Sequence, residues 1–331
     1  MRDGQSVLDA ALEAGMNLPH SCKSGHCTSC RAQLLGGRIH YPKGWPAGLT
    51  QAEHAAGRVL LCQARAASDL VIETRRIARA TEVEIRRLPC RIERRVLLAA
   101  DVLQLFLRLP AAEPFTFQPG QYLDVLLDAG RRRSFSIASP PHDAAQLELH
   151  VRRAPGSGFT QQLFDSPDAL TSLQIEGPIG QFVYQPSAAP LLLIAGGTGF
   201  APIKSILRHV LEVERGARPV RVYWGAQNVA GLYEDAQLLA WCASHPRLSY
   251  TGVLSDPPPE LTAGSSTTVL AAHHRRGWVH QIAAAAVRDL AAHDIYLAGP
   301  PALIEAVRCD YVQSGVDPTR IRFDSFDYAP R

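Results

Sequence analysis

The spacing of apolar residues changes along the chain, and each change predicts a different kind of structure. Residues 6–15 carry apolar side chains at helical spacing after a polar cap, Ser6, and end in a glycine, which predicts a short helix. Residues 31–39 and 69–74 are short apolar runs of the kind that form strands. A charged stretch at residues 75–87 predicts a linker or the start of the next strand.

From residue 90 the pattern becomes that of an all-β segment. Runs that alternate apolar and polar residues are separated by Pro/Gly turns, at 90–109, 120–127, 132–138, 147–153 and 172–177. Strands of such even spacing are typical of a small antiparallel barrel.

From about residue 190, helical runs alternate with short, continuously apolar strands. The predicted strands are residues 191–195, 220–226, 248–254 and 294–300. This alternation predicts an α/β domain with a parallel sheet, because parallel strands need a crossover connection, usually a helix. Residues 257–266 form a low-complexity tract and predict a loop.

Length and composition narrow the class of protein. A chain of 331 residues with 46% hydrophobic content can form several separate cores, and its length predicts about two or three domains. The net charge of +3 is too small and too dispersed to indicate nucleic-acid binding. No apolar run approaches the ~20 residues of a membrane span, and the N-terminus does not resemble an export signal. The composition predicts a soluble, cytoplasmic protein.

Four of the seven cysteines have a spacing that indicates a specific chemistry. Cys22, Cys27 and Cys30 follow a C-x4-C-x2-C pattern, and Cys62 lies further along the chain. This is the plant-type ligand pattern for a [2Fe–2S] cluster. The residues between them are small, so their backbone N–H groups can reach the cluster sulfurs, and Gly25 can adopt a positive φ where the loop curls.

Other interpretations explain the cysteine spacing less well. A zinc site more often has two C-x2-C pairs, and only Cys27 and Cys30 form one. A disulfide framework belongs to a small secreted domain, and chance clustering of buried cysteines is the remaining alternative. Cys90, Cys242 and Cys309 stand alone and are predicted to be buried structural thiols.

A glycine-rich turn from Gly196 to Gly199 follows one predicted strand and precedes a helical run. Glycines let a backbone approach a pyrophosphate, and a helix N-terminus supplies oriented N–H groups. The turn lacks the G-x-G-x-x-G form, so alone it is weak evidence. Gly299, in the run AGPP, ends another strand at the same carboxyl edge, where open α/β sheets bind ligands. The two turns together predict a nucleotide site.

The β segment holds a second group of candidate residues. Arg133, Ser134, Phe135 and Ser136 lie on one predicted strand, where the arginine can pair with a phosphate and the phenyl ring can stack on a flat ring. An ordinary strand with one polar face is the alternative. The later runs HVRR and GSGFT add two arginines and a flexible turn with exposed N–H groups, which is a further candidate anion site.

With these motifs assembled, the chain resembles the ferredoxin–NADP⁺ reductase superfamily, in its iron–sulfur flavoprotein branch, over essentially its full length. RRSFS looks like the flavin motif R-x-Y-S, GGTGFAP like the nicotinamide turn, and AGPP like the C-G-P-P motif. CDP-6-deoxy-glucoseen reductases are the most similar group, and reductase components of oxygenases are nearly as similar. The resemblance implies an α+β β-grasp ferredoxin domain at 1–80, an antiparallel β-barrel FAD domain at 86–187 and an α/β parallel-sheet NAD(P) domain at 188–331.

The resemblance also implies roles for individual residues. The cluster ligands would be Cys22, Cys27, Cys30 and Cys62. The FAD contacts would be Arg133, Ser134, Phe135, Ser136, Val151, Arg152, Gly158 and Thr160. The nicotinamide contacts would be Gly196, Gly197, Thr198, Gly199, Gly299 and Pro300. The residues next to the reacting rings, and so catalytic, would be Ser136, Thr198 and the terminal aromatic Phe326.

Three departures from the family pattern lead to further expectations. Phe135 replaces the usual tyrosine and removes a hydroxyl that could bond the flavin ribityl chain, so FAD should bind less tightly. Ala298 replaces a cysteine that lies close to the hydride path in relatives, so hydride transfer should be slower. The family's ferredoxin domain opens with a β-hairpin, most of which would precede Met1; we therefore expect the assigned start to be misplaced, since a sheet without that hairpin exposes an edge.

The leading hypothesis for function is electron transfer. NAD(P)H would give a hydride to FAD, and single electrons would leave through the [2Fe–2S] cluster to an acceptor protein such as an oxygenase component. The alternative acceptor is a dehydratase of deoxysugar biosynthesis, and a non-catalytic redox carrier or sensor is the alternative from another class. Asn228 follows the second dinucleotide strand with no adjacent Lys or Arg for a 2′-phosphate, which favours NADH.

Overall fold

The computed structural model describes the chain except for residues 1–3, 15, 19, 21–22, 24, 26–29, 47, 75–77, 80–84, 112–114, 129–130, 144–145, 155, 157, 167–169, 257–270 and 327–331. The chain divides into two compact units. One unit comprises Met1–Ile85 with Ser325–Arg331, and the other comprises Arg86–Asp324. The finer domain boundaries expected from the sequence stay predictions.

The first unit opens with the helix that the sequence predicts. Helix α1 (Val7–Glu13) is capped by Ser6, whose hydroxyl accepts a 3.0 Å hydrogen bond from the backbone N–H of Asp9. Helix α2 (Gln51–Ala55) begins at a capping box formed by Thr50 and Glu53. Both helices therefore begin at a side-chain cap that the local sequence provides.

Short strands make up the rest of this unit. A three-stranded antiparallel sheet has the order β4 (Arg58–Leu60), β2 (Arg31–Gly36), β6 (Val71–Glu73). Two small antiparallel pairs join β3 (Ile39–His40) to β5 (Arg65–Ala66) and β1 (Met16–Asn17) to β7 (Ala78–Arg79). The core is formed by apolar residues from α1, β2 and β4, among them Leu8, Ala32, Val59 and Leu60.

The second unit begins with an antiparallel six-stranded sheet of order β11–β10–β13–β8–β9–β12. Its strands are β8 (Arg86–Ala99), β9 (Val102–Arg108), β10 (Tyr122–Leu126), β11 (Arg132–Ser136), β12 (Gln146–Arg152) and β13 (Ser172–Ile179). An antiparallel bridge between Ile137 and Leu149 joins the two edge strands, so the sheet closes on itself. The predicted antiparallel barrel is confirmed.

The sequence interpretation was wrong about the run GSGFT, which we expected to be a flexible turn. Its glycine at 158 begins helix α3 (Gly158–Asp165). Phe159 and Leu163, one helical turn apart, pack into the core of the barrel and give this helix its apolar face. Burial of that face stabilises a helix that the glycines alone argue against.

The remainder of the second unit is a six-stranded sheet of order β17–β16–β15–β14–β18–β19. Its strands are β14 (Leu191–Gly196), β15 (Val220–Ala226), β16 (Leu248–Leu254), β17 (His274–Arg276), β18 (Asp294–Gly299) and β19 (Ile321–Ser325). The pairs from β17 to β18 are parallel, as predicted. Strands β17 and β19 lie at the edges of the sheet and were not expected from the sequence.

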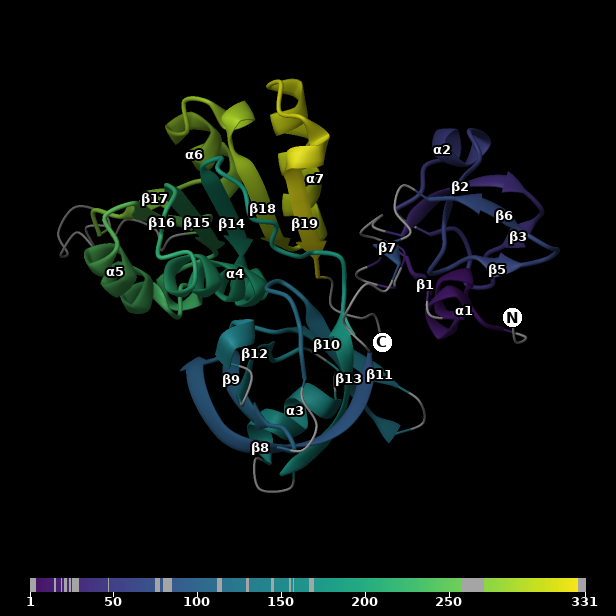
Figure 1. Cartoon of the computed structure of the whole chain (residues 1–331), viewed down its shortest axis with the longest axis horizontal. Helices are drawn as coiled ribbons and strands as arrows, with labels where there is room; N and C mark the ends of the chain where they lie inside the picture. The colour runs from purple at the N-terminus through teal and green to yellow at the C-terminus, as the bar shows by residue number, and fades with distance from the viewer. Residues whose placement is uncertain are drawn as a thin grey trace. The chain divides into compact units, whose positions relative to one another are not determined.

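Helices cover both faces of this parallel sheet. Figure 1 shows α4 (Phe200–Glu212) and α5 (Asp235–Ser244) on one face, and α6 (Val279–Ala286) and α7 (Pro301–Gln313) on the other. Strand β14 is buried along its length except at its terminal glycine, as expected for a central strand covered on both sides. Single 3₁₀ turns occur at Pro141–Asp143, Gly197–Gly199, Val229–Gly231, Leu290–Ala292 and Pro318–Arg320.

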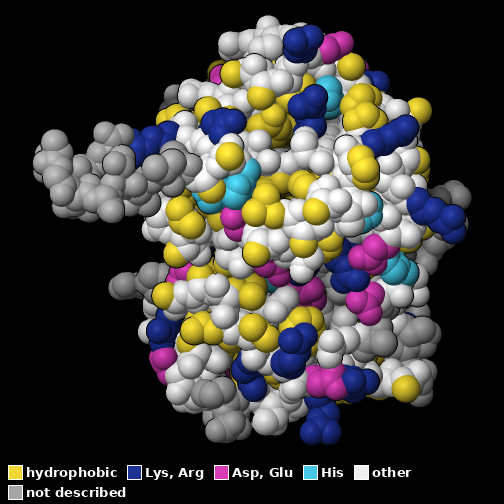
Figure 2. Space-filling view, turned by 90° about the vertical axis from the view of Figure 1, so that its left-hand side faces the viewer, with side chains coloured by type: hydrophobic (Ala, Val, Ile, Leu, Met, Phe, Trp, Pro, Cys, Tyr) yellow, Lys and Arg dark blue, Asp and Glu magenta, His cyan; other side chains and the backbone are white. Residues whose placement is uncertain are grey.

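The surface is mixed in charge. On the face in Figure 2, Lys and Arg side chains are scattered among Asp and Glu side chains, in keeping with the small net charge of +3. Within the described part of the chain, no helix has the length and apolar content that crossing a membrane requires.

Candidate cofactor sites

Two of the predicted cluster ligands lie at adjacent ends of paired strands. Cys30 immediately precedes β2, and Cys62 lies in the turn after β4. The two strands pair antiparallel, and the N–H of Leu61 donates to the carbonyl of Cys30 at 3.2 Å. Both thiols are buried. The fold thus brings together two cysteines from distant positions in the sequence, as a cluster site requires.

The described part of the cysteine loop has the backbone that the sequence predicts. Gly25 has a φ of +85°, and a Cβ there would lie 2.8 Å from the side chain of Gln63. Gln63 donates from Nε2 to the carbonyl of Lys23 at 2.7 Å and to the sulfur of Cys62 at 4.0 Å. Donors to thiolate sulfur are what an iron–sulfur centre needs, so these residues fit a cluster. Cys22 and Cys27 lie outside the described residues.

The flavin motif occupies strand β11. Its residues alternate between the two faces of the strand, so Arg133 and Phe135 share one face while Ser134 and Ser136 share the other. Phe135 is half-buried, and its ring centroid lies 6.1 Å from that of Phe159. Part of the Phe135 ring therefore remains accessible to a flat ligand.

The serines of the motif already have partners within the protein. Ser134 donates to a carboxylate oxygen of Asp124 at 2.6 Å. Ser136 is buried, and its Oγ lies 3.5 Å from a carboxylate oxygen of Asp324 at the end of the parallel sheet. Ser136 therefore lies where the barrel and the parallel sheet meet, which is where a flavin and a nicotinamide have to come together.

Two of the predicted FAD contacts, Val151 and Arg152, lie on opposite faces at the end of β12. The side chain of Val151 is fully buried in the barrel core, so only its backbone is available to a ligand. Arg152 points to the other face, with its Nε 3.1 Å from a carboxylate oxygen of Asp101. A cationic side chain that is one-quarter exposed at this position can still bind an anion.

Helix α3 presents its first turn as a second anion-binding element. Gly158 is its first residue, and nothing lies within 4 Å of the place a Cβ would take. Thr160 is buried, and its hydroxyl accepts a 3.1 Å hydrogen bond from the N–H of Ala154. The first-turn N–H groups of a helix have no partner within that helix and suit a pyrophosphate, so this end of α3 fits the predicted role.

The nicotinamide turn is built on glycines because other backbone approaches it closely. A Cβ on Gly199 would lie 2.2 Å from the carbonyl oxygen of Ala298, and one on Gly196 would lie 2.9 Å from Pro300. Gly299 has a φ of +157°, and a Cβ there would lie 3.1 Å from the Cα of Gly196. The two glycine turns therefore meet at the carboxyl ends of neighbouring parallel strands, as the sequence predicts.

Two larger side chains hold the turn in place. Trp224 donates from Nε1 to the carbonyl of Gly197 at 2.9 Å, and its indole stacks on Phe200 at 4.1 Å between centroids. The guanidinium of Arg152 lies over Gly197, whose hypothetical Cβ would be 3.2 Å from Nη1. Thr198 lies between these contacts in the 3₁₀ turn and is half-buried.

The remaining predicted residues lie near chain turns. Pro300 is the N-cap residue of α7, and Ala298, which replaces the family cysteine, is fully buried in β18. Phe326 directly follows β19 and is half-buried. The roles assigned to the individual cofactor-binding and catalytic residues stay predictions.

Sequence reasoning missed a buried polar network between the barrel and the parallel-sheet region. The ammonium of Lys204 on α4 lies 2.7 Å from Glu148 Oε1 and 2.6 Å from Glu234 Oε1. His150 Nε2 lies 2.8 Å from the same Glu148 oxygen, and Gln104 donates a 2.6 Å hydrogen bond to that oxygen. All five side chains belong to buried residues.

Charge compensation makes this network tolerable in the interior. Burial raises the pKa of Glu148, but the hydrogen bond from His150 and the charge of Lys204 outweigh that effect and hold its pKa well below the ordinary value. Glu148 is therefore an ionised carboxylate matched to a buried ammonium. One sequence signal pointed to it: Lys204 lies between Ile203 and Ile206 in an apolar stretch of helix, where a lysine needs a partner.

Comparisons with known proteins agree with this geometry. Three family models match: "2Fe-2S iron-sulfur cluster binding domain" at residues 1–67, "Oxidoreductase FAD-binding domain" at 89–184 and "Oxidoreductase NAD-binding domain" at 193–309. Their order is that of the cysteine loop, the closed barrel and the parallel sheet. The multidomain fold class and the three cofactors expected from the sequence are confirmed.

Individual relatives match along nearly the whole chain. Terephthalate 1,2-dioxygenase reductase component 2 of Comamonas sp. is 36% identical over 333 residues, covering 99% of this chain and 94% of that protein. CDP-6-deoxy-L-threo-D-glycero-4-hexulose-3-dehydrase reductase of Yersinia pestis is 32% identical over 325 residues, covering 98% and 94%. The crystal structure of Amycolatopsis cytochrome P450 reductase GcoB superposes with a TM-score of 0.80 at 31% identity, covering 99% and 96%.

The matched families and the geometry of the candidate sites indicate the same type of protein. The described cysteines, the flavin strand and the two glycine turns lie within the three matched domains. The relatives are reductases of oxygenase systems or of a dehydrase. The chain belongs to the ferredoxin–NADP⁺ reductase superfamily, in the branch of NAD(P)H-dependent iron–sulfur flavoprotein oxidoreductases.

Proposed function

We propose that this chain is the reductase component of a multicomponent oxygenase, taking electrons from NADH and delivering them singly to the oxygenase. The observation that carries the proposal is the 36% identity, over 99% of the chain, to a reductase component of terephthalate 1,2-dioxygenase. The acceptor protein, the preferred nucleotide and a cytoplasmic location are all parts of the proposal.

When bound, FAD would supply the conversion of a hydride into single electrons, and the [2Fe–2S] cluster would supply a one-electron carrier. The protein residues supply positions. Gly196 and Gly299 leave bare backbone at the carboxyl edge of the sheet, where a dinucleotide can lie close. Arg133 and the first turn of α3 offer positive charge and N–H groups to a pyrophosphate. Proximity of the two rings, without a general acid or base, is enough for hydride transfer.

The choice of NADH rests on the end of β15. Residues 225–234 contain no Lys or Arg, so they offer no cation to a 2′-phosphate. Asn228 instead caps the following 3₁₀ turn, with its Oδ1 accepting from the N–H of Gly231 at 3.3 Å. We expect kcat/KM to be higher for NADH than for NADPH.

Anaerobic titration of the holoprotein with each nucleotide tests the first half of the proposal. NADH should bleach the flavin absorbance and produce the EPR signal of a reduced [2Fe–2S] cluster. Failure of both nucleotides to bleach the flavin would support the alternative from another class, a redox carrier or sensor that does not oxidise nicotinamides.

A cysteine pair tests the route through the cluster. Cys62→Ser should keep nicotinamide-dependent flavin bleaching while losing most reduction of cytochrome c, because a cluster ligand is gone. Cys309→Ser is the matched control, since Cys309 belongs to the other compact unit and, contrary to the expectation of a buried thiol, is exposed on α7. Equal rates of cytochrome c reduction by the Cys62 variant and the control would contradict a route through the cluster.

A second candidate acceptor is a sugar dehydratase. The 32% identity to the Yersinia pestis reductase over 98% of the chain favours it specifically. Assaying the holoprotein with a purified Rieske or di-iron oxygenase component, and separately with a hexulose dehydrase, distinguishes the two candidates by which one supports NADH-dependent turnover.

A further inference from the structure

Two clusters among the described residues bring together three side chains of the kinds that bind metals. In the first, formed by Glu148, His150 and Glu234, the ammonium of Lys204 already occupies the place of a cation. The second cluster is formed by Asp235, His273 and His274. The Asp235 carboxylate contacts the two imidazoles and the hydroxyl of Tyr250. Of these two clusters, only the second could bind a metal ion without displacing a lysine ammonium.

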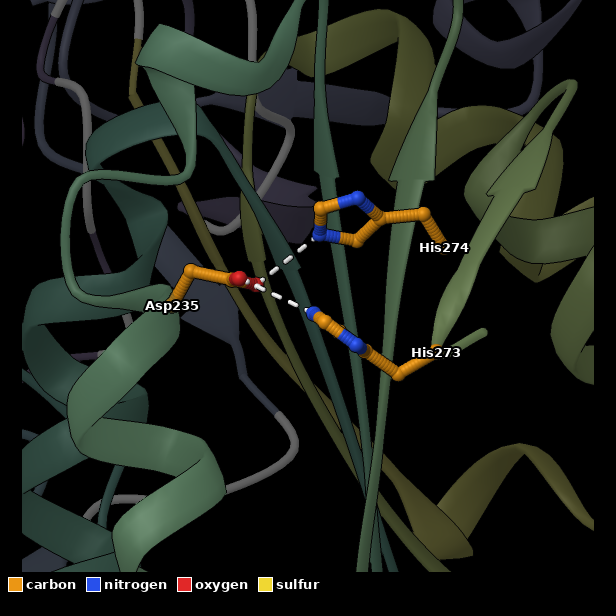
Figure 3. Close-up of side chains that lie close together, drawn as sticks. All are labelled: Asp235, His273 and His274. Carbon is orange, nitrogen blue, oxygen red and sulfur yellow. Dashed lines mark hydrogen bonds and ion pairs between the residues drawn. The ribbon is translucent and has the colours of Figure 1, made fainter. Parts of the chain in front are cut away.

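The second cluster is formed by two separate elements. Asp235 is the first residue of α5, His273 lies in the turn before β17, and His274 is the first residue of β17. Figure 3 shows both imidazoles pointing at the carboxylate from the side opposite α5. His273 Nε2 lies 2.9 Å from Asp235 Oδ2, and His274 Nε2 lies 3.1 Å from Asp235 Oδ1.

The convergence of two consecutive histidines depends on the local backbone. Neighbouring residues of a regular strand point to opposite faces, so adjacent imidazoles would normally diverge. Here the N–H of His274 donates to the carbonyl of Ala271 at 2.8 Å, and this turn rotates His273 toward the side that His274 faces. Their ring centroids lie 4.1 Å apart.

A glycine in the neighbouring strand makes room for the histidine ring. Gly252 of β16 pairs with His274, and a Cβ on Gly252 would lie 2.6 Å from Cδ2 of His274. A glycine within a strand weakens that strand, and such glycines often mark a place where other groups approach closely. The side chain of His274 is 5% exposed, whereas those of His273 and Asp235 are 21% and 23% exposed. The cluster is thus held on one side and open to solvent on the other.

The donor set selects the type of ion. The Asp235 carboxylate accepts a hydrogen bond from Tyr250 at 2.6 Å and faces the two imidazole nitrogens with its two oxygens, so it is directed into the cluster. Two imidazole nitrogens and one carboxylate oxygen are the ligand set of sites such as the His₂Glu zinc centres, with water in the open position.

We propose that Asp235, His273 and His274 bind a divalent transition-metal ion of the Zn²⁺ class, which ties the first turn of α5 to the edge strand β17. Ligands at about 2.1 Å from a tetrahedral ion lie about 3.4 Å from one another. In this structure the imidazole nitrogens lie 2.9 and 3.1 Å from the two oxygens of the Asp235 carboxylate, and one ligand atom from each of the three residues lies within 4.8 Å of the others, so small side-chain rotations can bring them to that spacing. Binding leaves the oxidation state of Zn²⁺ unchanged, and a proton on Nε2 moves to Nδ1 or to solvent when that nitrogen becomes a ligand.

Equilibrium dialysis of the holoprotein against Zn²⁺ tests the proposal. Elemental analysis counts zinc, and the iron measured in the same sample reports that the cluster is intact. The wild type should bind about one more zinc per chain than His273→Gln, which should bind at least about tenfold more weakly. Glutamine can still donate an N–H to Asp235, so this variant keeps the structural hydrogen bond while losing the imidazole ligand.

A matched control separates ligation from hydrogen bonding. Tyr250 donates to Asp235 Oδ1 at 2.6 Å but is not a proposed ligand, so Tyr250→Phe should keep the zinc. Zinc should also raise the melting temperature of the wild type and of Tyr250→Phe, and not that of His273→Gln. Zinc binding that is equal in the wild type and His273→Gln, or that is lost in Tyr250→Phe and kept in His273→Gln, would overturn the proposal.

Discussion

Lys204 is the residue whose replacement most directly tests how the barrel and the parallel-sheet region are held together. It is 6% exposed and is the ammonium shared by Glu148 and Glu234, which are 4% and 9% exposed. Lys204→Met keeps most of the aliphatic volume and removes the charge. Two buried carboxylates then face each other without a cation, and breaking a buried ion pair in this way costs about 3–5 kcal/mol.

That cost can be measured as a change in thermal stability. The unit Arg86–Asp324 is of a size for which 1 kcal/mol corresponds to about 2–4 °C, so the variant should melt roughly 6–20 °C lower. Arg208→Met is the matched control, because Arg208 lies one turn further along α4 and pairs with the exposed Glu212 at 2.7 Å. Loss of such a surface pair should cost about 0–1 kcal/mol.

The pH dependence distinguishes lost charge compensation from lost packing. In the wild type the pKa of Glu148 is lower in the folded than in the unfolded protein. Its contribution to the free energy of unfolding is therefore fully present above about pH 4.3 and is lost as the pH falls toward the folded pKa. In Lys204→Met, burial without a cation raises the pKa of the Glu148 carboxylate. The stability lost relative to the wild type should therefore become smaller as the pH falls from about 8 to about 5.

Two outcomes would refute this reasoning. One is a melting temperature for Lys204→Met that falls no further than that of Arg208→Met, since the buried charges would then need no cation. The other is a deficit that stays constant with pH, which would indicate lost packing alone. Adding Glu148→Gln to Lys204→Met should recover part of the stability, because one uncompensated charge is removed.

Three further substitutions test the cofactor sites. Gly199→Ala places a Cβ 2.2 Å from a carbonyl oxygen and should destabilise the protein by at least about 3 kcal/mol, whereas Gly158→Ala, with open space around it, should change the unfolding free energy by less than about 1 kcal/mol in chemical denaturation. Phe135→Tyr should tighten FAD binding about two- to tenfold by fluorescence titration, the value of one hydrogen bond, while Phe164→Tyr on α3 should leave it unchanged. Ala298→Cys should raise the rate of flavin reduction by NADH in stopped flow; an unchanged rate in a variant that melts like the wild type would show that the thiol is not what limits the step.

Much of the fold could be predicted because apolar periodicity is a local property of the sequence. In the barrel strands apolar and polar residues alternate, and in the central strands of the parallel sheet apolar residues form continuous runs. Both patterns can be recognised from neighbouring residues alone. The edge strand β17 could not be predicted, since it is only three residues long and exists through pairing with β16. Helix α3 was missed because glycines open it and its stability comes from the barrel core.

The candidate site shows the same division. The glycine turns and the C-x4-C-x2-C spacing are patterns of residues close together in the sequence, so sequence reasoning could identify them. Glu148 and Lys204 are 56 positions apart, and only the folded chain shows that one compensates the other. The residues that bind a cofactor often form motifs, whereas the residues that position one part of a protein against another do not.

Strand β12 connects the flavin and nicotinamide sites through its two faces. Leu147, Leu149 and Val151 are buried in the barrel core, while Glu148, His150 and Arg152 alternate with them and point outward. The outward residues contact Lys204, Phe200 and Gly197, all within the turn and first helix of the nicotinamide site.

A displacement of the nicotinamide turn away from the barrel therefore has to break an ion pair, a ring contact and the packing of Arg152 on glycine together. Because all three contacts begin on β12, we expect this strand to set the spacing between the barrel and the glycine turn. Substitutions of Glu148 or His150 should consequently change the rate of flavin reduction, although neither residue is a predicted cofactor contact.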